Sequence, residues 1–271
     1  MGVSYFERLG QCLAEPDPAR KVAAVRELYA VRRFLAEDEG VDEQEGRPLP
    51  IIRVGRPQRP LLVEPKHLPR RRLSSKKGHA ALIHSIAHIE FNAINLALDA
   101  GCRFRGLPSA YYADWLKVAA EEAYHFHLLN EHLQSLGFAY GDFEAHDGLW
   151  QMAEETAHDP LVRMALIPRV LEARGLDVTP GMLERLERIG DHRAVTILQL
   201  ILRDEITHVA VGSYWFNYLC RQRGLDAIAT FTRLLRIYLR APPKPPFHTE
   251  ARLQAGFTAE EMALLEALVE P

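Results

Sequence analysis

The chain has 271 residues, of which 48% are hydrophobic, and its 33 basic and 36 acidic side chains give a formal net charge of −3. This composition is typical of a soluble globular protein. No apolar run approaches the roughly 20 residues of a membrane helix, and the N-terminus lacks the apolar segment of a signal peptide. The three scattered cysteines are too few for a disulfide framework. We therefore expect a cytoplasmic protein without a membrane partner.

The N-terminal region, residues 1–45, is predicted to contain two helices, at 4–12 and 18–36, because apolar residues recur there at helical spacing. The next region, residues 46–77, is rich in arginine, lysine and proline, and its basic stretch contains Glu64 as the only acid. Proline at this density prevents a helix and favours extended backbone. We predict an extended arm that lies along the main body of the protein.

Four long helical stretches follow the arm and form the predicted core region, residues 78–222. Gly101 and Gly137 are expected to end the first two, since glycine is common at helix C-termini. Pro168 is expected to kink the third, which is also interrupted at Asp159–Pro160, and Asp191 can cap the fourth. The predicted ranges are 78–100, 108–137, 150–174 and 191–221.

Shorter helices are predicted beside these four. Thr179 followed by Pro180 is typical of an N-cap with proline at the first helical position, which predicts a separate short helix to Ile189. Helices at 225–239 and 258–269, separated by a proline-rich break, make up a C-terminal appendage of residues 223–271. No segment of the body shows the period of two residues that is typical of strands. The predicted fold class is therefore all-α.

The motif Glu-x-x-His occurs four times in the chain. The four matches are Glu64–His67, Glu122–His125, Glu155–His158 and Glu205–His208. A single match carries no weight, because chance produces one roughly every few hundred residues. The first match falls in the proline-rich arm and the third on a polar patch. The second and fourth instead place Glu and His in the middle of an apolar helix face.

Residues three apart share a helix face, so each of these two motifs directs a carboxylate and an imidazole into the core. Glu90 and Glu172 lie in the same way on apolar faces of the other two long helices. Glu90 precedes Glu122 by 32 residues, and Glu172 precedes Glu205 by 33 residues. The chain therefore resembles a duplicated helix pair. A buried carboxylate must be neutralised by a proton, a cationic side chain or a metal ion.

This is the ligand set of carboxylate-bridged two-metal sites in ferritin-like helix bundles. Two divalent ions would balance the four carboxylates, and oxygen with nitrogen ligation favours iron or manganese over zinc–cysteine chemistry. By analogy, Glu122 and Glu205 would bridge the two ions, while Glu90 and Glu172 would bind one ion each. The alternative is that all of these are core residues that are satisfied by one another and by water.

Six further residues are supporting candidates: Glu121, Asp204, Tyr124, Tyr214, His84 and His88. The two acids directly precede the bridging glutamates and could orient the histidine N–H groups. For the two tyrosines, plain packing is favoured over a radical or proton-relay role. The two histidines lie off the Glu90 face, which favours a packing or supporting role over metal ligation.

Four stretches of the chain carry a resemblance to a known family: HSIAHIEFNAINLALDAG, DWLKVAAEEAYHFHLL, YGDFEAHDGLWQMAEETAHDPLVRMALIPRVLEARGLDVTPGM and ILRDEITHVAVGSYWF. Together they resemble a bacterial ferritin-like family without assigned activity, domain of unknown function 455, from about residue 45 to residue 260. The resemblance implies a ferritin-like four-helix bundle. The metal positions it implies are Glu90, Glu122, His125, Glu172, Glu205 and His208.

Three functions are compatible with these features. The first is a di-iron or iron–manganese oxidase or hydroxylase that activates O2 against a small-molecule substrate. The second is an iron-binding ferroxidase for storage or detoxification. The third is a tRNA-modifying di-iron monooxygenase, an analogy at the level of the fold, with residues 47–77 as the nucleic-acid surface.

The sequence leaves several properties open. No flavin or nicotinamide fingerprint is present, so we expect an external electron donor. The substrate and the oligomeric state stay open, with a dimer as one option.

Overall fold

The computed structural model describes residues 4–35, 54–239 and 243–269. Across these residues the regular structure is helical, and the only extended pairing is one isolated bridge between Leu62 and Ala145. The prediction of an all-α protein is therefore confirmed. The chain divides into two compact units, Met1–Ala157 and His158–Pro271, and each is described by itself.

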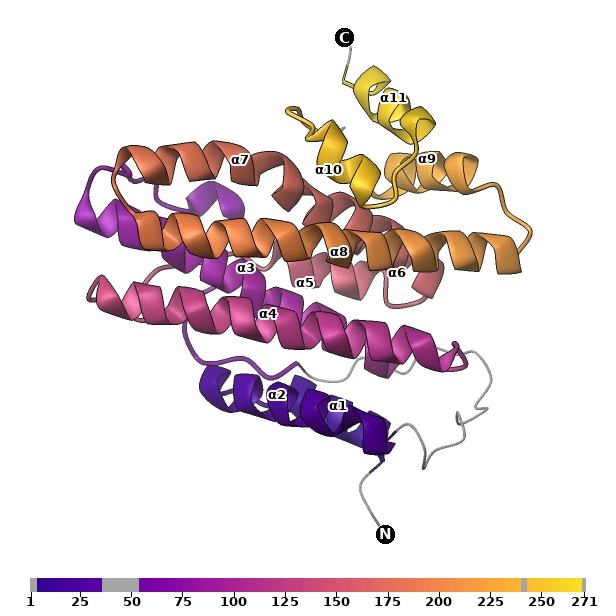
Figure 1. Ribbon diagram of the computed structural model, residues 1–271, viewed down its shortest axis with the longest axis horizontal. Helices are drawn as coiled ribbons and strands as arrows, with labels where there is room; N and C mark the ends of the chain where they lie inside the picture. Colours follow the sequence, from indigo (N-terminus) through magenta and orange to yellow (C-terminus); the bar gives the residue numbers. More distant parts are fainter. Residues whose placement is uncertain (1–3, 36–53, 240–242, 270–271) are drawn as a thin grey trace. The chain divides into compact units, whose positions relative to one another are not determined.

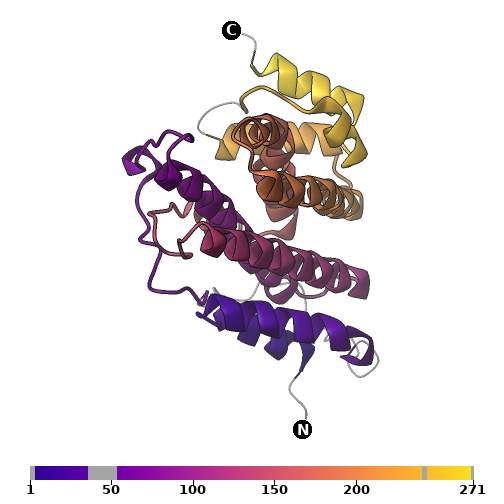
Figure 2. The ribbon, with the colours of Figure 1, turned by 60° about the vertical axis from the view of Figure 1, so that its left-hand side comes forward.

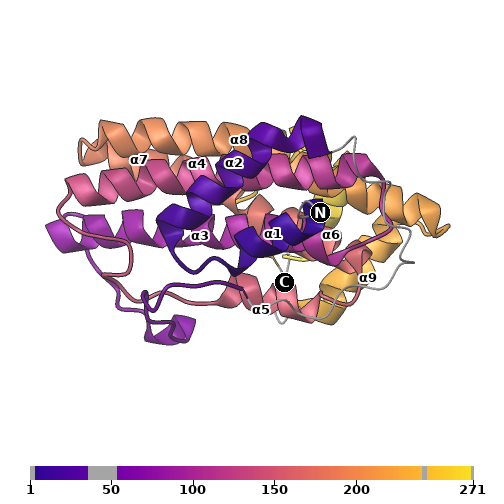
Figure 3. The same ribbon diagram turned by 90° about the horizontal axis from the view of Figure 1, so that it is seen from below.

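The first unit is built around a pair of long helices, α3 (Lys76–Arg103) and α4 (Ser109–Ser135), which pack along their length. Figure 1 shows them side by side. Helix α1 (Tyr5–Ala14) packs on α3 and helix α2 (Pro18–Leu35) packs on α4, so both N-terminal helices cover this pair (Figure 3). Helix α5 (Gly148–Glu155) completes the unit against α3.

The end of α3 differs from the prediction, because the helix does not stop at Gly101 but continues to Arg103. Two contacts explain the difference. A buried ion pair between Arg103 Nη2 and Asp99 Oδ1, 2.5 Å apart, joins side chains one turn apart and holds the last turn. Gly101 itself is covered, since a Cβ there would lie 3.5 Å from Leu9 Cδ1. Tertiary packing therefore overrides the tendency of glycine to end a helix.

Helix α3 is also long and apolar enough to cross a membrane by composition alone. However, 78% of its most apolar window is buried inside the structure, where it contacts α1 and α4. Its hydrophobicity is explained by its place in the core of the first unit, and the structure is compatible with a soluble protein.

The described part of the arm, residues 54–75, contains a 3-10 turn at Pro65–His67 and a second turn just before α3, where Ser75 N donates to Arg72 O at 3.1 Å; the rest has no helix. It is tied to the first unit by backbone hydrogen bonds to the loop before α5, with Val63 N donating to Ala145 O at 2.8 Å. The buried Lys21 Nζ of α2 also donates to Gly55 O at 3.1 Å. Lys76 and Lys77, which the prediction placed in the arm, are the first residues of α3, and residues 46–53 lie outside the described residues.

The second unit contains the other long helix pair. Helix α6 (Pro160–Leu166), a π-helical segment η2 (Ile167–Glu172) and helix α7 (Ala173–Arg188) form one continuous helical path that packs on α8 (His192–Gln222). Figure 2 shows α7 and α8 nearly end-on and side by side. The predicted cap of α8 is confirmed, because the Asp191 side chain accepts a hydrogen bond from Ala194 N at 2.9 Å.

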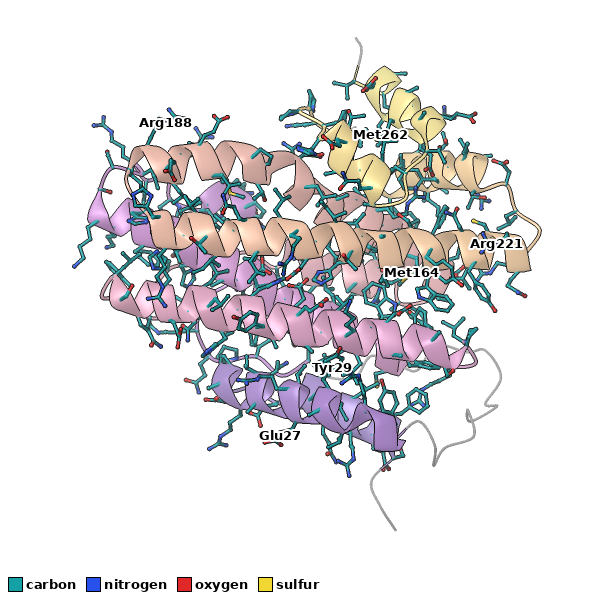
Figure 4. The ribbon with its side chains drawn as sticks, viewed as in Figure 1. Glu27, Tyr29, Met164, Arg188, Arg221 and Met262 are labelled. Atoms are coloured by element: carbon teal, nitrogen blue, oxygen red, sulfur yellow. The ribbon has the colours of Figure 1, made fainter. Side chains whose placement is uncertain are left out.

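Three shorter helices complete the second unit: α9 (Ala227–Tyr238), α10 (Thr249–Gln254) and α11 (Ala259–Ala267). Met164 of α6 and Met262 of α11, labelled in Figure 4, are both buried. Helix α10 is absent from the predicted elements, because its six residues give no helical period long enough to recognise.

The prediction of a separate helix from Thr179 is wrong. Helix α7 runs without a break from Ala173 to Arg188, with Pro180 inside it. The Thr179 hydroxyl does not cap a new helix but donates to Gly175 O, one turn earlier, at 2.7 Å. Proline costs the helix one hydrogen bond, and packing of α7 on α8 offsets this loss.

Candidate metal centre

Three of the predicted ligands meet in the core of the first unit. Glu90 comes from α3, and Glu122 and His125 come from consecutive turns of α4. His125 Nδ1 lies 3.3 Å from Glu90 Oε2 and 3.3 Å from Glu122 Oε2. One ligand atom from each of the three lies within 4.8 Å of the others, which is close enough for all three to bind one ion. The structure therefore contains a Glu/His cluster that could bind metal.

Burial of this cluster follows from the apolar faces on which its residues lie. The exposed fraction is 3% for Glu90 and 0% for both Glu122 and His125. Their neighbours one turn away, among them Ile94 of α3 and Phe126 of α4, are buried as well. Charged groups in such a setting are costly unless a counter-charge lies beside them.

The two neighbours of Glu90 have opposite effects on its pKa. Burial, together with the nearby negative charge of Glu122, raises the pKa of Glu90 well above its ordinary range, whereas His125 acts in the opposite direction. A divalent cation among these groups would relieve both the burial penalty and the repulsion between the carboxylates. The donor set of carboxylate oxygens and one imidazole nitrogen is one that binds divalent cations.

The other three predicted ligands belong to the second unit. Glu205 and His208 are buried on one face of α8, with His208 Nδ1 3.8 Å from Glu205 Oε1. Glu172 is half-buried and is the last residue of the π-helical segment η2. Pro168, four residues earlier, packs on Gly212 of α8. Because the two helices run in opposite directions, we expect this register to bring Glu172 toward the turn of α8 that holds His208.

The other two Glu-x-x-His motifs differ from these in burial. All four of their residues are exposed: Glu64, His67, Glu155 and His158. An exposed carboxylate is solvated by water and does not need a metal ion to neutralise it. The two Glu-x-x-His motifs that the sequence predicts to be ligands are therefore buried, and the other two are exposed.

The supporting acids each have a basic partner beside them on their own helix. Glu121 Oε1 lies 3.6 Å from Lys117 Nζ, and Asp204 Oδ1 accepts a hydrogen bond from Arg203 Nε at 3.0 Å. Their role in orienting the ligand histidines stays a prediction.

The two tyrosines lie at the surface, with exposed fractions of 48% for Tyr124 and 55% for Tyr214. The Tyr214 ring packs edge-on against the neighbouring Trp215, with the ring centroids 5.0 Å apart. Exposure of this degree favours neither a radical nor a proton-relay role, both of which need a route into the core.

His84 and His88 hold the loop that follows α4. His84 Nε2 accepts a hydrogen bond from Gly141 N at 2.9 Å, and its ring stacks on Tyr140. His88 Nδ1 lies 2.8 Å from the Tyr140 hydroxyl. Burial lowers the pKa of each histidine to about 4, so both are neutral at neutral pH. Both rings therefore pack on Tyr140 of this loop.

Two buried basic residues, Lys21 and Arg169, are absent from the predicted candidates, although each is fully buried. The signal for Arg169 is a lone arginine inside an apolar run three residues before Glu172. Lys21 gives no such signal, because its three acceptors come from separate parts of the first unit.

Comparison with known proteins adds a family but no activity. A family model described as "Protein of unknown function (DUF455)" matches residues 14–263. A protein from Haemophilus influenzae, described as an uncharacterized protein, is 54% identical over 268 residues, which are 95% of this chain and 92% of that protein. No solved structure matches the chain significantly.

Proposed function

Since the chain belongs to the DUF455 family of proteins of unknown function, we propose its function from its own residues: a ferritin-like protein with a two-metal carboxylate centre that activates O2. Its reaction would be the oxidation or hydroxylation of a small organic substrate. The observation that carries this proposal is the buried contact of His125 with both Glu90 and Glu122 in the first unit. The same order of ligands, one Glu and then Glu-x-x-His, recurs in the second unit.

Both sets of ligands would serve one centre of two divalent ions, either two irons or iron with manganese. Four carboxylates against two divalent cations leave a neutral cluster, which a buried site requires. Glu122 and Glu205 would bridge the ions, Glu90 and Glu172 would each bind one ion, and the two histidines would supply nitrogen ligands. When bound, such an ion pair supplies the reducing equivalents and the site at which O2 is activated.

The residues around the ligands would protect this chemistry. Ile86 and Ile94 of α3 and Phe126 of α4 are buried apolar neighbours that keep water away from the carboxylates of the first unit. Electrons would come from an external donor protein. The three cysteines, Cys12, Cys102 and Cys220, are buried free thiols, which supports a reducing, cytoplasmic setting.

Metal analysis of the purified protein and two variants tests this proposal. We expect about two ions of iron or manganese per chain in the unaltered protein, and a loss of at least half of them in Glu122→Ala. The matched control is Glu155→Ala, which alters an exposed Glu-x-x-His motif and should retain all of the metal. Circular dichroism of each variant establishes that it is folded.

The proposal is overturned if the purified protein holds neither iron nor manganese and if Glu122→Ala leaves the metal content unchanged. If the metal is present, anaerobic reduction followed by exposure to O2 tests the redox step, and we expect reoxidation at about one O2 per two ions. Iron uptake far above two ions per chain, in a particle of shell-forming size, would instead indicate storage.

One observation favours the nucleic-acid alternative for the substrate. Arg70, Arg71 and Arg72 of the arm are all exposed, as are Lys76 and Lys77 at the start of α3. Such a cluster attracts phosphate, and its affinity should fall steeply with salt. Salt-dependent binding of tRNA that is lost when the three arginines are changed to glutamine would support an RNA substrate; binding insensitive to salt would exclude this surface.

A further inference from the structure

The second unit contains a cavity of about 230 Å³ that the proposed metal chemistry does not use. Its walls come from η2, the start of α7, Leu239, residues 243–247, α10 and α11. The share of liquid volume taken by one water molecule is about 30 Å³, so this space could hold a small organic molecule in place of several waters. The cavity is therefore large enough for a ligand.

The charges of the cavity are predominantly positive. Four basic side chains line it, Arg169, Arg174, Lys244 and Arg252, against one acidic lining residue, Asp177. Asp177 forms a bidentate ion pair with Arg252, whose Nη2 and Nε donate to the two carboxylate oxygens at 2.7 and 2.9 Å. Arg169 is likewise paired with Glu261, and Arg174 Nη1 lies 3.6 Å from Asp177 Oδ2. The four basic groups therefore face two carboxylates, and the remaining charge of +2 favours an anion.

Arg169 is the feature that points most directly to a ligand. Its side chain is 0% exposed, and its guanidinium lies 4.4 to 4.8 Å from the centroids of three rings, those of Phe216, Phe231 and Phe257. Nη2 donates to Glu261 Oε1 at 2.6 Å. Within the described residues, Nε and Nη1 are buried without a hydrogen-bond partner. Buried donors of this kind seldom stay unsatisfied, and Arg169 is one of the residues that line the cavity.

The rim of the cavity is held in place by a second arginine. Arg174 Nη1 donates to two backbone carbonyls of the segment after α9, Lys244 O at 2.6 Å and Pro246 O at 3.1 Å. This contact keeps the segment closed against α7 and leaves the Lys244 side chain exposed at the edge. Apolar side chains, among them Leu171 and Leu265, supply the rest of the wall.

We propose that this cavity binds a small organic anion, with a carboxylate or phosphate head group near Arg169, Arg174 and Lys244 and an apolar part against the leucines. A guanidinium fork and an ammonium group both recognise such oxyanions, through hydrogen bonds that carry charge. The apolar wall selects for a ligand with a short hydrocarbon portion. The proposal does not depend on the metal centre, because none of its residues is a predicted metal ligand.

Isothermal titration calorimetry of the full-length protein tests the proposal with a matched set of six-carbon probes. The probes are hexanoate and hexyl phosphate, with hexylamine and hexanol as controls for charge. We expect saturable 1:1 binding of at least one anion and none of either control. Binding of hexanoate alone identifies a carboxylate site, and binding of hexyl phosphate alone identifies a phosphate site; either outcome supports an anion cavity.

Variants establish where the anion binds. Lys244→Gln and Arg174→Gln each remove one charge at the rim without altering the buried Arg169, and we expect affinity to fall roughly tenfold or more in each. Arg188→Gln is the matched control, because Arg188 is an exposed arginine at the far end of the same helix (Figure 4). Absence of anion binding, or equal affinity in all three variants and the unaltered protein, would overturn the proposal.

Discussion

Pro168 of the π-helical segment lies directly against Gly212 of α8, so that a Cβ on Gly212 would come within 2.2 Å of the Pro168 Cγ atom. Real side chains never approach so closely, and only glycine is compatible with this contact. The contact sets the register between the segment that ends at Glu172 and the helix that carries Glu205 and His208. The contact between Pro168 and Gly212 therefore determines where Glu172 lies relative to Glu205 and His208.

Gly212→Ala should destabilise the protein by about 1–3 kcal/mol, because the added methyl group forces the two helices apart. Urea denaturation measures the change in the free energy of unfolding. Gly175→Ala is the matched control, since a Cβ at this helical position would meet nothing within 4 Å. We expect that control to be neutral or slightly stabilising. Equal stability of Gly212→Ala and the unaltered protein would show that the contact does not hold the register.

The extent to which the fold follows from the sequence differs between the two long helix pairs. Helical periodicity and the Asp191 cap predict α8 well, because both signals are local. The π-helical segment is not predictable in the same way, since it depends on Pro168 meeting Gly212, more than 40 residues further along the chain. Thr179 and Pro180 gave a wrong boundary for the same reason: packing on α8 outweighs the local signal.

For the candidate site, the spacing of Glu122 and His125 predicts a shared helix face, and the structure adds their burial and their contact with Glu90. The surface position of Tyr124 follows from the same spacing, because a residue two positions after Glu122 lies about 200° around the helix, away from the buried face. By contrast, no local pattern shows that Arg169 enters an aromatic cage, since its three rings come from distant segments.

Because the pKa of Lys21 is lowered in the folded protein, we expect the free energy of unfolding to depend on pH in the alkaline range. Its Nζ donates to Leu13 O at 2.9 Å and to the arm at Gly55 O at 3.1 Å, and burial lowers its pKa from 10.5 to about 7. Between these two values the unfolded chain binds a proton that the folded chain lacks. The free energy of unfolding should therefore rise with pH from about 7 toward 10, by up to about 1.4 kcal/mol per pH unit.

Lys21→Met provides the control for this prediction, because it removes the titrating group while keeping most of the side-chain volume. It should be less stable than the unaltered protein, since it leaves the carbonyls of Leu13 and Gly55 without their donor. Urea denaturation at pH 7, 8 and 9 compares the two proteins. The same dependence on pH in both would mean that Lys21 is charged in the folded state.

Because the pKa of His84 is also lowered, we expect the free energy of unfolding to depend on pH in the acidic range as well. Its Nε2 accepts a hydrogen bond from Gly141 N, and burial lowers its pKa from 6.5 to about 4. The unfolded chain therefore binds the proton first. The stability that His84 contributes is complete above pH 6.5 and is lost as the pH falls toward 4, by up to about 1.4 kcal/mol per pH unit.

Hydrogen exchange at the Gly141 amide measures this change, because the opening that exposes the amide also exposes His84 Nε2, which then binds a proton at its ordinary pKa of 6.5. After correction for the intrinsic effect of pH on exchange, protection should fall between pH 6.5 and 4. His84→Gln, which keeps an acceptor but does not titrate, should show no such loss. Constant protection in the unaltered protein would contradict the assignment.

We propose above that Glu90, Glu122, His125 and the matching residues of the second unit bind a pair of metal ions. A crystal structure with anomalous scattering measured at the iron and manganese absorption edges tests it most directly. We expect two anomalous peaks about 3.5–4 Å apart, bound by the six predicted ligands and bridged by Glu122 and Glu205. The absence of any peak within reach of Glu122, or metal bound only at exposed histidines, would contradict it.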